Sequence, residues 1–108
     1  MIHAELREQC MHVHIRGPLT IYQAIDFKPQ LLAALKGAHE AEIDLADVSE
    51  IDSAGLQLLL LASREAQIAG HRLTLVGFSD ACKTIIETLG LSDYFQSVGS
   101  DTQNGVLQ

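Results

Sequence analysis

Residues 10–16 alternate between apolar and polar side chains and are rich in β-forming residues, which predicts a strand. Residues 4–8 are expected to pair with it as a preceding edge strand. Gly17 and Pro18 should end the second strand, because proline lacks the backbone N–H that a sheet ladder needs. The chain is therefore predicted to begin with an antiparallel hairpin.

Apolar residues recur at helical spacing after this hairpin. Thr20 is a suitable N-cap for a helix over residues 21–36, which Gly37 should end. Pro29 lies inside this segment and is expected to kink the helix or restart it, because it removes an internal hydrogen bond.

The rest of the chain continues to alternate between strands and helices. The predicted segments are a strand over 41–45, a turn over 46–51, a helix over 53–69, a strand over 72–77, a helix over 80–89 and a short helical turn over 92–95. Ser79 should cap the last long helix, and Gly70 and Gly90 should end the two helices. Residues 97–108 are polar and are expected to form a disordered tail.

The element order β-β-α-β-α-β-α predicts the fold class. Strands that alternate with helices form βαβ crossovers, so the sheet should be small and mostly parallel, with the first hairpin antiparallel at one side. No internal repeat or long linker divides the chain. We therefore expect one α/β domain over residues 1–96, with helices packed on the sheet.

The composition narrows the function classes. Fourteen acidic and seven basic residues give a formal net charge of −7, which disfavours binding to nucleic acid or to anionic lipid. No apolar run is long enough to span a membrane, and no signal peptide is recognisable, so a cytoplasmic location without membrane insertion is expected. Cys10 and Cys82 lack CxxC spacing and are expected to be small buried hydrophobes.

The helix over 53–69 carries an ambiguous pattern on a helical wheel. One side is expected to pack on the sheet, and it holds Leu58, Leu59, Leu61, Ala62, Ala66, Ile68 and Ala69. The opposite side holds Ser53, Gln57, Arg64 and Gln67, together with Leu56 and Leu60. These two leucines have two interpretations: they enter a second buried face, or they form an exposed apolar patch for binding.

Ser53 stands at the start of this helix, where unpaired backbone N–H groups and the helix dipole favour negative charge. A phosphate there would add roughly −1.5 to −2 charge beside Leu56 and Leu60. The preceding carboxylates, with no Lys or Arg among them, are Glu40, Glu42, Asp44, Asp47, Glu50 and Asp52. Ser53 is also a candidate N-cap, and a capping hydroxyl remains able to accept phosphate.

Residues 48–59, Val-Ser-Glu-Ile-Asp-Ser-Ala-Gly-Leu-Gln-Leu-Leu, resemble the signature of the STAS domain, the family of sulfate transporters and anti-sigma factor antagonists. Segments 17–22, 43–45 and 70–77 resemble the same family. The resemblance spans residues 4–96 with the strands and helices in register. The Asp-Ser-x-Gly-Leu motif is short, and it gains its specificity from this order and length.

The resemblance implies a regulatory binding protein that is not an enzyme and needs no cofactor. In stand-alone members, an anti-sigma factor that is also a serine kinase, an ATPase of histidine-kinase-like fold, phosphorylates the serine after the Asp. The unphosphorylated form binds that kinase and frees a sigma factor, and a phosphatase resets the switch. On this chain the implied phosphoacceptor is Ser53. The implied partner-binding residues are Thr20, Asp52, Ser53, Leu56, Gln57 and Leu60.

Two positions depart from the kinase-coupled pattern. Many kinase-coupled members have Gly-Glu-Leu-Asp where residues 17–20 are Gly-Pro-Leu-Thr, so the acidic residue is missing. Ala54 follows Ser53 where Ser or Thr is common, which resembles STAS subunits of lipid-transporting ABC complexes. A constitutive scaffold subunit of such a complex is therefore the alternative function. Because that branch often has Thr at the acceptor position, Ser53 favours the phosphoswitch.

No catalytic, nucleotide or metal site is expected. Ser53 lacks the glycines of a nucleophile elbow, and the sequence contains no glycine-rich phosphate loop. His39 and His71 each follow a helix and are expected far from Ser53. His12 and His14 point the same way on a strand, but a solvated strand face is favoured because no third metal ligand is evident.

Overall fold

The structure is a computed structural model that describes residues 1–92. Its elements are β1 (Ile2–Arg7), β2 (Cys10–Leu19), α1 (Ile21–Lys36), β3 (Glu40–Ile51), α2 (Ser53–Ala69), β4 (Arg72–Val76) and α3 (Asp80–Thr88). This order confirms the predicted β-β-α-β-α-β-α arrangement. Apart from Ser92, the predicted helical turn over 92–95 lies outside the described residues, and so does the tail over 97–108.

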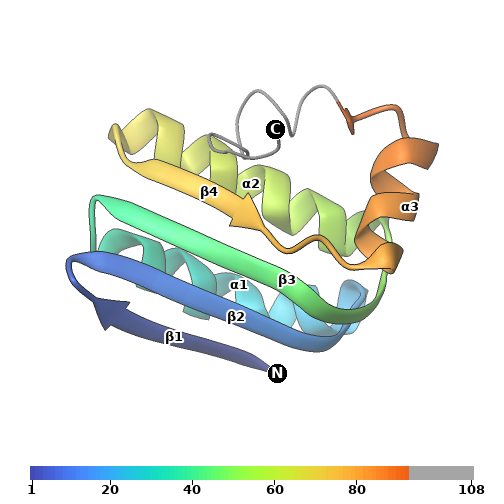
Figure 1. The fold of residues 1–108 in the computed structure, drawn as a ribbon, viewed down its shortest axis with the longest axis horizontal. Coiled ribbons are helices and arrows are strands. Elements are labelled where there is room, and N and C mark those ends of the chain that lie inside the picture. The colour runs from blue at the N-terminus through green and yellow to red at the C-terminus, as the bar shows by residue number, and fades with distance from the viewer. Residues whose placement is uncertain (93–108) are drawn as a thin grey trace.

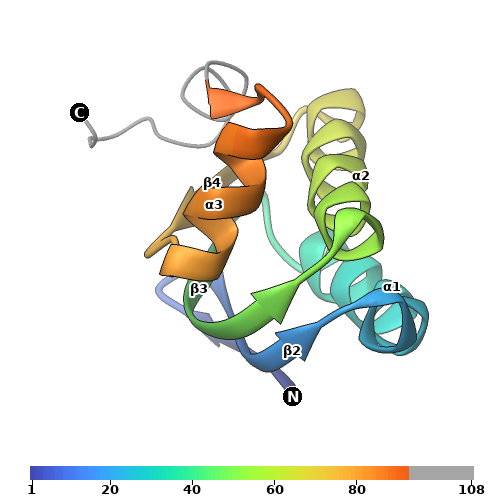
Figure 2. The ribbon, with the colours of Figure 1, turned by 90° about the vertical axis from the view of Figure 1, so that its right-hand side faces the viewer.

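One mixed sheet of four strands, in the order β1-β2-β3-β4, forms one layer of the domain. β1 and β2 are antiparallel, whereas the other two pairs are parallel. α1 and α2 lie side by side on one face of this sheet, and α3 lies beyond the carboxyl end of β4 (Figures 1 and 2). Within residues 1–92, no helix covers the other face of the sheet.

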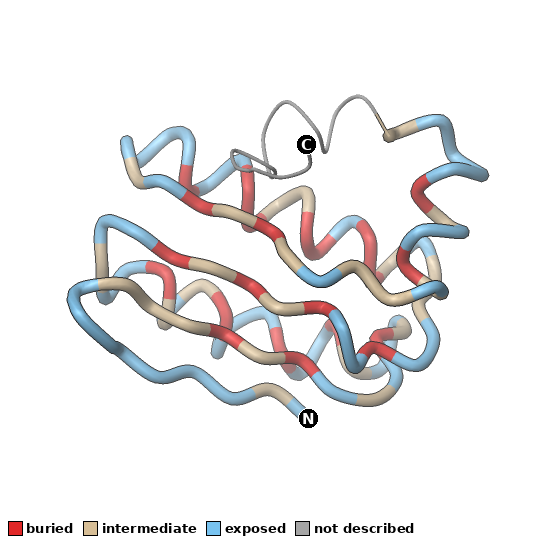
Figure 3. The backbone as a smooth tube through the Cα atoms, viewed as in Figure 1, coloured by how far each residue is buried: buried red, intermediate tan, exposed pale blue. Residues whose placement is uncertain are grey.

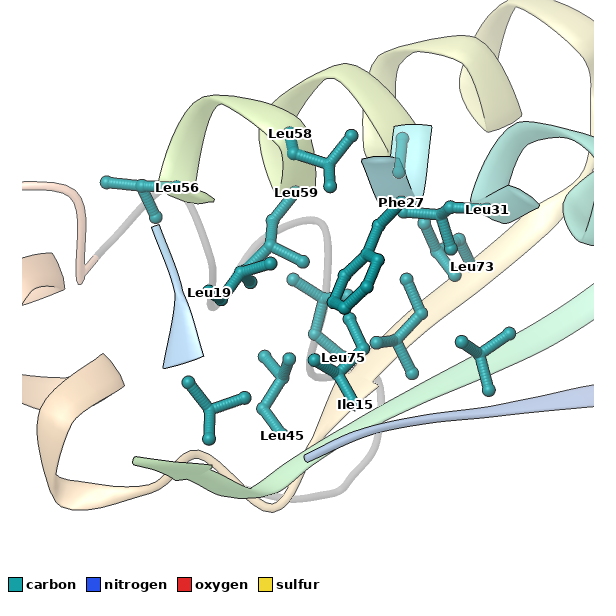
Figure 4. Packing of buried hydrophobic residues seen from close by; sticks show 14 of the residues in the cluster. Ile15, Leu19, Phe27, Leu31, Leu45, Leu56, Leu58, Leu59, Leu73 and Leu75 are labelled. Carbon is teal, nitrogen blue, oxygen red and sulfur yellow. The ribbon is translucent and has the colours of Figure 1, made fainter. Parts of the chain in front are cut away.

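The core lies between the sheet and the α1–α2 layer. Buried and half-buried residues alternate along the central strands (Figure 3), as expected for a sheet with one covered face. The covered face contributes Val13, Ile15, Ala41, Ile43, Leu45, Leu73 and Leu75, and the helices contribute Phe27, Leu31, Leu58 and Leu59 (Figure 4). None of the helices in residues 1–92 is long and apolar enough to cross a membrane.

β2 and β3 run further than the sequence predicted. β2 continues through Gly17 and Pro18 to Leu19, and β3 replaces the predicted turn over 46–51. Residues 16–19 and 47–51 pair with each other beyond the last residue pair of β4, and we call this two-stranded extension the ribbon. Register shifts around Gly17, whose φ is 86°, accommodate the proline within the ladder.

The helix boundaries agree well with the predictions. Thr20 and Ser79 are the N-caps of α1 and α3, and Gly70 ends α2 in the left-handed conformation. α1 does not restart at Pro29 but continues through it to Lys36. Packing of the α1 apolar face on the sheet therefore outweighs the missing hydrogen bond at the proline.

Candidate functional site

The ribbon brings the starts of α1 and α2 to the same end of the molecule. Leu19, which precedes the α1 cap, pairs in register with Ile51, which precedes the α2 cap. The two strand-to-helix connections therefore lie side by side. We call this region the helix-start site, and it consists of Thr20, Ile21, Asp52, Ser53, Ala54 and Gly55.

Asp52 is the N-cap of α2, and the expectation that Ser53 caps the helix is wrong. The Asp52 backbone is extended, and its Oδ1 accepts a hydrogen bond from the Gly55 N–H at 2.9 Å. Its Oδ2 accepts a second hydrogen bond from the Ile21 N–H of α1 at 3.0 Å. One carboxylate thus connects the starts of both helices.

Ser53 is the first residue of α2 and is exposed. The capping position is occupied by Asp52, and among residues 1–92 the Ser53 hydroxyl has no hydrogen-bond partner. The hydroxyl is therefore accessible and not used in the fold. This geometry is compatible with a phosphoacceptor.

Thr20 uses its polar groups locally. Its backbone N–H and its hydroxyl both donate to Oε1 of Gln23, at 3.1 and 2.6 Å. Thr20 is half-buried, and it lies one residue before the α1 amide that Asp52 holds. Thr20 therefore belongs to the helix-start site through its neighbour Ile21.

Gly55 allows the first turn of α2 to lie directly against the end of β2. A Cβ at this position would collide with the carbonyl oxygen of Leu19 and would lie 3.0 Å from Cγ1 of Ile51. The glycine of the Asp-Ser-x-Gly-Leu motif therefore has a steric role. It sets the close approach that brings the two helix starts together.

Leu56 is not a contact residue on the surface, because it is only 2% exposed. Figure 4 shows it at the start of α2. Leu60 is half-buried and packs against the same core. The buried side of α2 includes Leu56 and Ser63, and this rotation leaves Ile68 and Ala69 exposed instead of buried as predicted. Of the two interpretations of the leucines, the second buried face is confirmed for Leu56.

The apolar surface beside Ser53 comes from a groove of about 330 Å³ between α1 and α2. The groove is lined by Ile21, Ala24, Ile25, Lys28, Ala54, Gln57, Leu58 and Leu61. Ile21 and Ile25 are 50% and 67% exposed, and Gln57 is exposed as expected for a contact residue. Neither isoleucine was predicted as a site residue, although their i, i+4 spacing is the signal that places them on one face of α1.

The two histidines of β2 form separate contacts on the uncovered face of the sheet. Nδ1 of His12 lies 3.4 Å from Oε1 of Glu42, and Nε2 of His14 lies 2.8 Å from Oδ2 of Asp47. In the part of the chain that the structure describes, no group of three or more His, Cys, Asp or Glu is arranged to hold a metal ion.

Several solved structures share this fold. The anti-sigma factor antagonist SpoIIAA in its unphosphorylated form is 18% identical, with a TM-score of 0.71, and the match covers 87% of this chain and 84% of that one. The phosphorylated form of the Bacillus cell fate determinant SpoIIAA is 18% identical, with a TM-score of 0.68, and the match covers 87% of both chains. An anti-sigma factor antagonist from Mycobacterium paratuberculosis is 21% identical, with a TM-score of 0.72, and the match covers 88% of this chain and 81% of that one.

A sulfate transporter family protein from Wolinella succinogenes is also similar, at 19% identity and a TM-score of 0.70, covering 93% of this chain and 83% of that one. At these identities the structural matches establish the fold. The family model described as "Mlab, STAS domain" matches residues 2–99, which is nearly the whole chain. The chain belongs to the STAS domain family.

Proposed function

We propose that this STAS domain is an anti-sigma factor antagonist whose binding is switched by phosphorylation of Ser53. In the unphosphorylated form it binds an anti-sigma factor that is also a serine kinase, and a phosphatase restores this form after modification. It acts in the cytoplasm and is not itself an enzyme. The observation that carries the proposal is the exposed Ser53 hydroxyl, which has no hydrogen-bond partner among residues 1–92 and lies next to an apolar groove.

The surroundings of Ser53 explain how a phosphate would act. The modified side chain would lie beside the Asp52 carboxylate, so two anions would share the same helix start. It would also border the groove at Ala54, where a partner would have to bury the added charge. Removing a charge from water without a counter-ion is unfavourable, so phosphorylation would release the partner.

Affinity capture from a host lysate tests this function. The baits are the Ser53→Ala and Ser53→Asp variants, and Ser49→Asp is the matched control because Ser49 is exposed on neighbouring β3. A kinase of histidine-kinase-like fold should bind the Ser53→Ala and Ser49→Asp baits and lose at least about tenfold in affinity, or ~1.4 kcal/mol, for Ser53→Asp. Equal capture by all three baits would contradict the phosphoswitch.

A constitutive scaffold subunit of a lipid-transporting ABC complex is the second candidate. Ala54, which lines the groove, is the residue that favours it. A transporter ATPase captured equally by the Ser53→Ala and Ser53→Asp baits would support this function. Absence of any ATPase or permease from both baits would eliminate it.

A further inference from the structure

We propose that Asp52 is a positioning residue that holds the start of α1 against the start of α2, and that phosphorylation of Ser53 reaches α1 through it. The regulatory half of this inference rests on the proposed function. The positioning half rests on the geometry of the isolated chain. Asp52 thus acts within the fold and not by touching a partner.

The two oxygens of Asp52 serve two helices. Oδ1 holds the Gly55 N–H in the first turn of α2, and Oδ2 holds the Ile21 N–H, 31 residues away in the sequence. Neither helix has an acidic residue in its first turn. The Asp52 carboxylate therefore compensates the positive ends of both helix dipoles, which makes both hydrogen bonds charge-assisted.

The bond to Ile21 also shapes the groove. Ile21 lines one wall, and Ala54 and Gln57, within the first two turns of α2, line the other. Because the Ile21 amide is tied to Asp52, its half-exposed side chain is held at a fixed position relative to α2. Loss of this bond would free the first turn of α1 and alter the groove beside Ser53.

A phosphate on Ser53 would disturb this arrangement directly. Ser53 is covalently next to Asp52, and its phosphate would bring three acceptor oxygens and about two negative charges to the same helix start. The phosphate would repel the Asp52 carboxylate and compete for its two N–H donors. We therefore expect the Ile21 N–H to lose its bond to Oδ2 when Ser53 is phosphorylated.

The Asp52→Asn variant separates the two bonds. Asparagine caps helices as well as aspartate, so its carbonyl oxygen keeps the Gly55 N–H, but its amide NH2 cannot accept from Ile21. Solvent exchange of single amides, measured by NMR, should rise about tenfold at Ile21 and change less than about threefold at Gly55. Asp52→Ser, with a shorter capping side chain, should behave in the same way.

The control is Ser79→Ala, which removes the N-cap of α3 and should alter exchange at Cys82 but not at Ile21. Unchanged Ile21 exchange in Asp52→Asn and Asp52→Ser would overturn the positioning role. A rise at Ile21 in Ser79→Ala as large as in the Asp52 variants would also overturn it, because general loosening would then explain the effect.

The regulatory half is tested with phosphoserine incorporated at position 53. Phosphorylation should raise Ile21 exchange in the wild-type sequence and have little further effect in the Asp52→Asn background, since the bond is already absent there. Equal increments in both backgrounds, or no increment in the wild type, would overturn transmission through Asp52. No partner is needed, so the kinase capture can fail while this test succeeds, and the reverse also holds.

Discussion

At the scale of single residues, Gly55 and Asp52 build the helix-start site by two different means. Gly55 removes a side chain that would collide with the backbone of β2, and Asp52 adds a carboxylate that joins two helices. Ser53 lies between them in the sequence and takes no part in either contact. Its two neighbours are fixed by the fold, whereas its own side chain is exposed.

Replacing Gly55 tests the steric part of this arrangement. Gly55→Ala should lower the free energy of unfolding by about 3 kcal/mol, because the added methyl meets the rigid carbonyl of Leu19. Gly70→Ala is the matched control: nothing lies within 4 Å of its added methyl, and the left-handed φ of 74° should lower the free energy of unfolding by only about 1 kcal/mol. Equal losses in denaturant unfolding would show that close approach is not the reason for Gly55.

At the scale of elements, the ribbon is the part of the sheet that positions the site. Its two strands lead directly into α1 and α2, and it lies beyond the reach of β4. Val48 is 2% exposed and Leu19 is fully buried, so the ribbon is anchored to the core at both strands. Its outer residues, including Ser49 and Glu50, are exposed.

Val48→Ala should therefore lower the free energy of unfolding by about 2 kcal/mol, through the lost methyl groups and the small cavity left behind. Ser49 is the exposed neighbour, and Ser49→Ala should change the free energy of unfolding by no more than about 0.5 kcal/mol. Denaturant titrations of both variants check the expectation. If Ser49→Ala lowered the free energy of unfolding as much as Val48→Ala, the outer face of the ribbon would contribute as much to stability as its buried face.

The sequence predicted the element order and the caps at Thr20 and Ser79, because these depend on local patterns. It did not predict the ribbon, since Gly17 and Pro18 are local strand breakers that pairing between β2 and β3 overrides. The cap at Asp52 was missed, and the choice between the two interpretations of Leu56 stayed open, for a similar reason. Both depend on how α2 is rotated against the rest of the fold, which a helical wheel alone does not determine.

At the scale of the whole molecule, α3 attaches to the core through a few buried residues. Cys82 is 1% exposed and Ile86 is 7% exposed, and both come from α3. Burial raises the pKa of the Cys82 thiol above its ordinary value of 9.0, whereas a hydrogen bond with Ser79 opposes that rise. The folded state therefore favours the neutral thiol, and the unfolded state loses that proton more easily.

The stability that this thiol contributes is present in full below its unfolded pKa of 9.0 and is lost as the pH rises through the higher folded pKa. The wild type should thus lose more stability between pH 7 and pH 10 than Cys82→Ala, although the variant is less stable at pH 7. Denaturant unfolding at both pH values checks this expectation. If both proteins lost the same free energy of unfolding between pH 7 and pH 10, ionisation of Cys82 would not contribute to the pH dependence of stability.

The strand order has a consequence for folding during translation. Every pair of neighbours in the sheet is also consecutive in the chain, so no strand has to wait for a partner from the far end. The two parallel pairs each close a connection that contains a whole helix, however, and non-local parallel pairing of this kind slows folding. During synthesis, each new strand emerges after the neighbour on which it docks, and the residues of the helix-start site are all translated before α3.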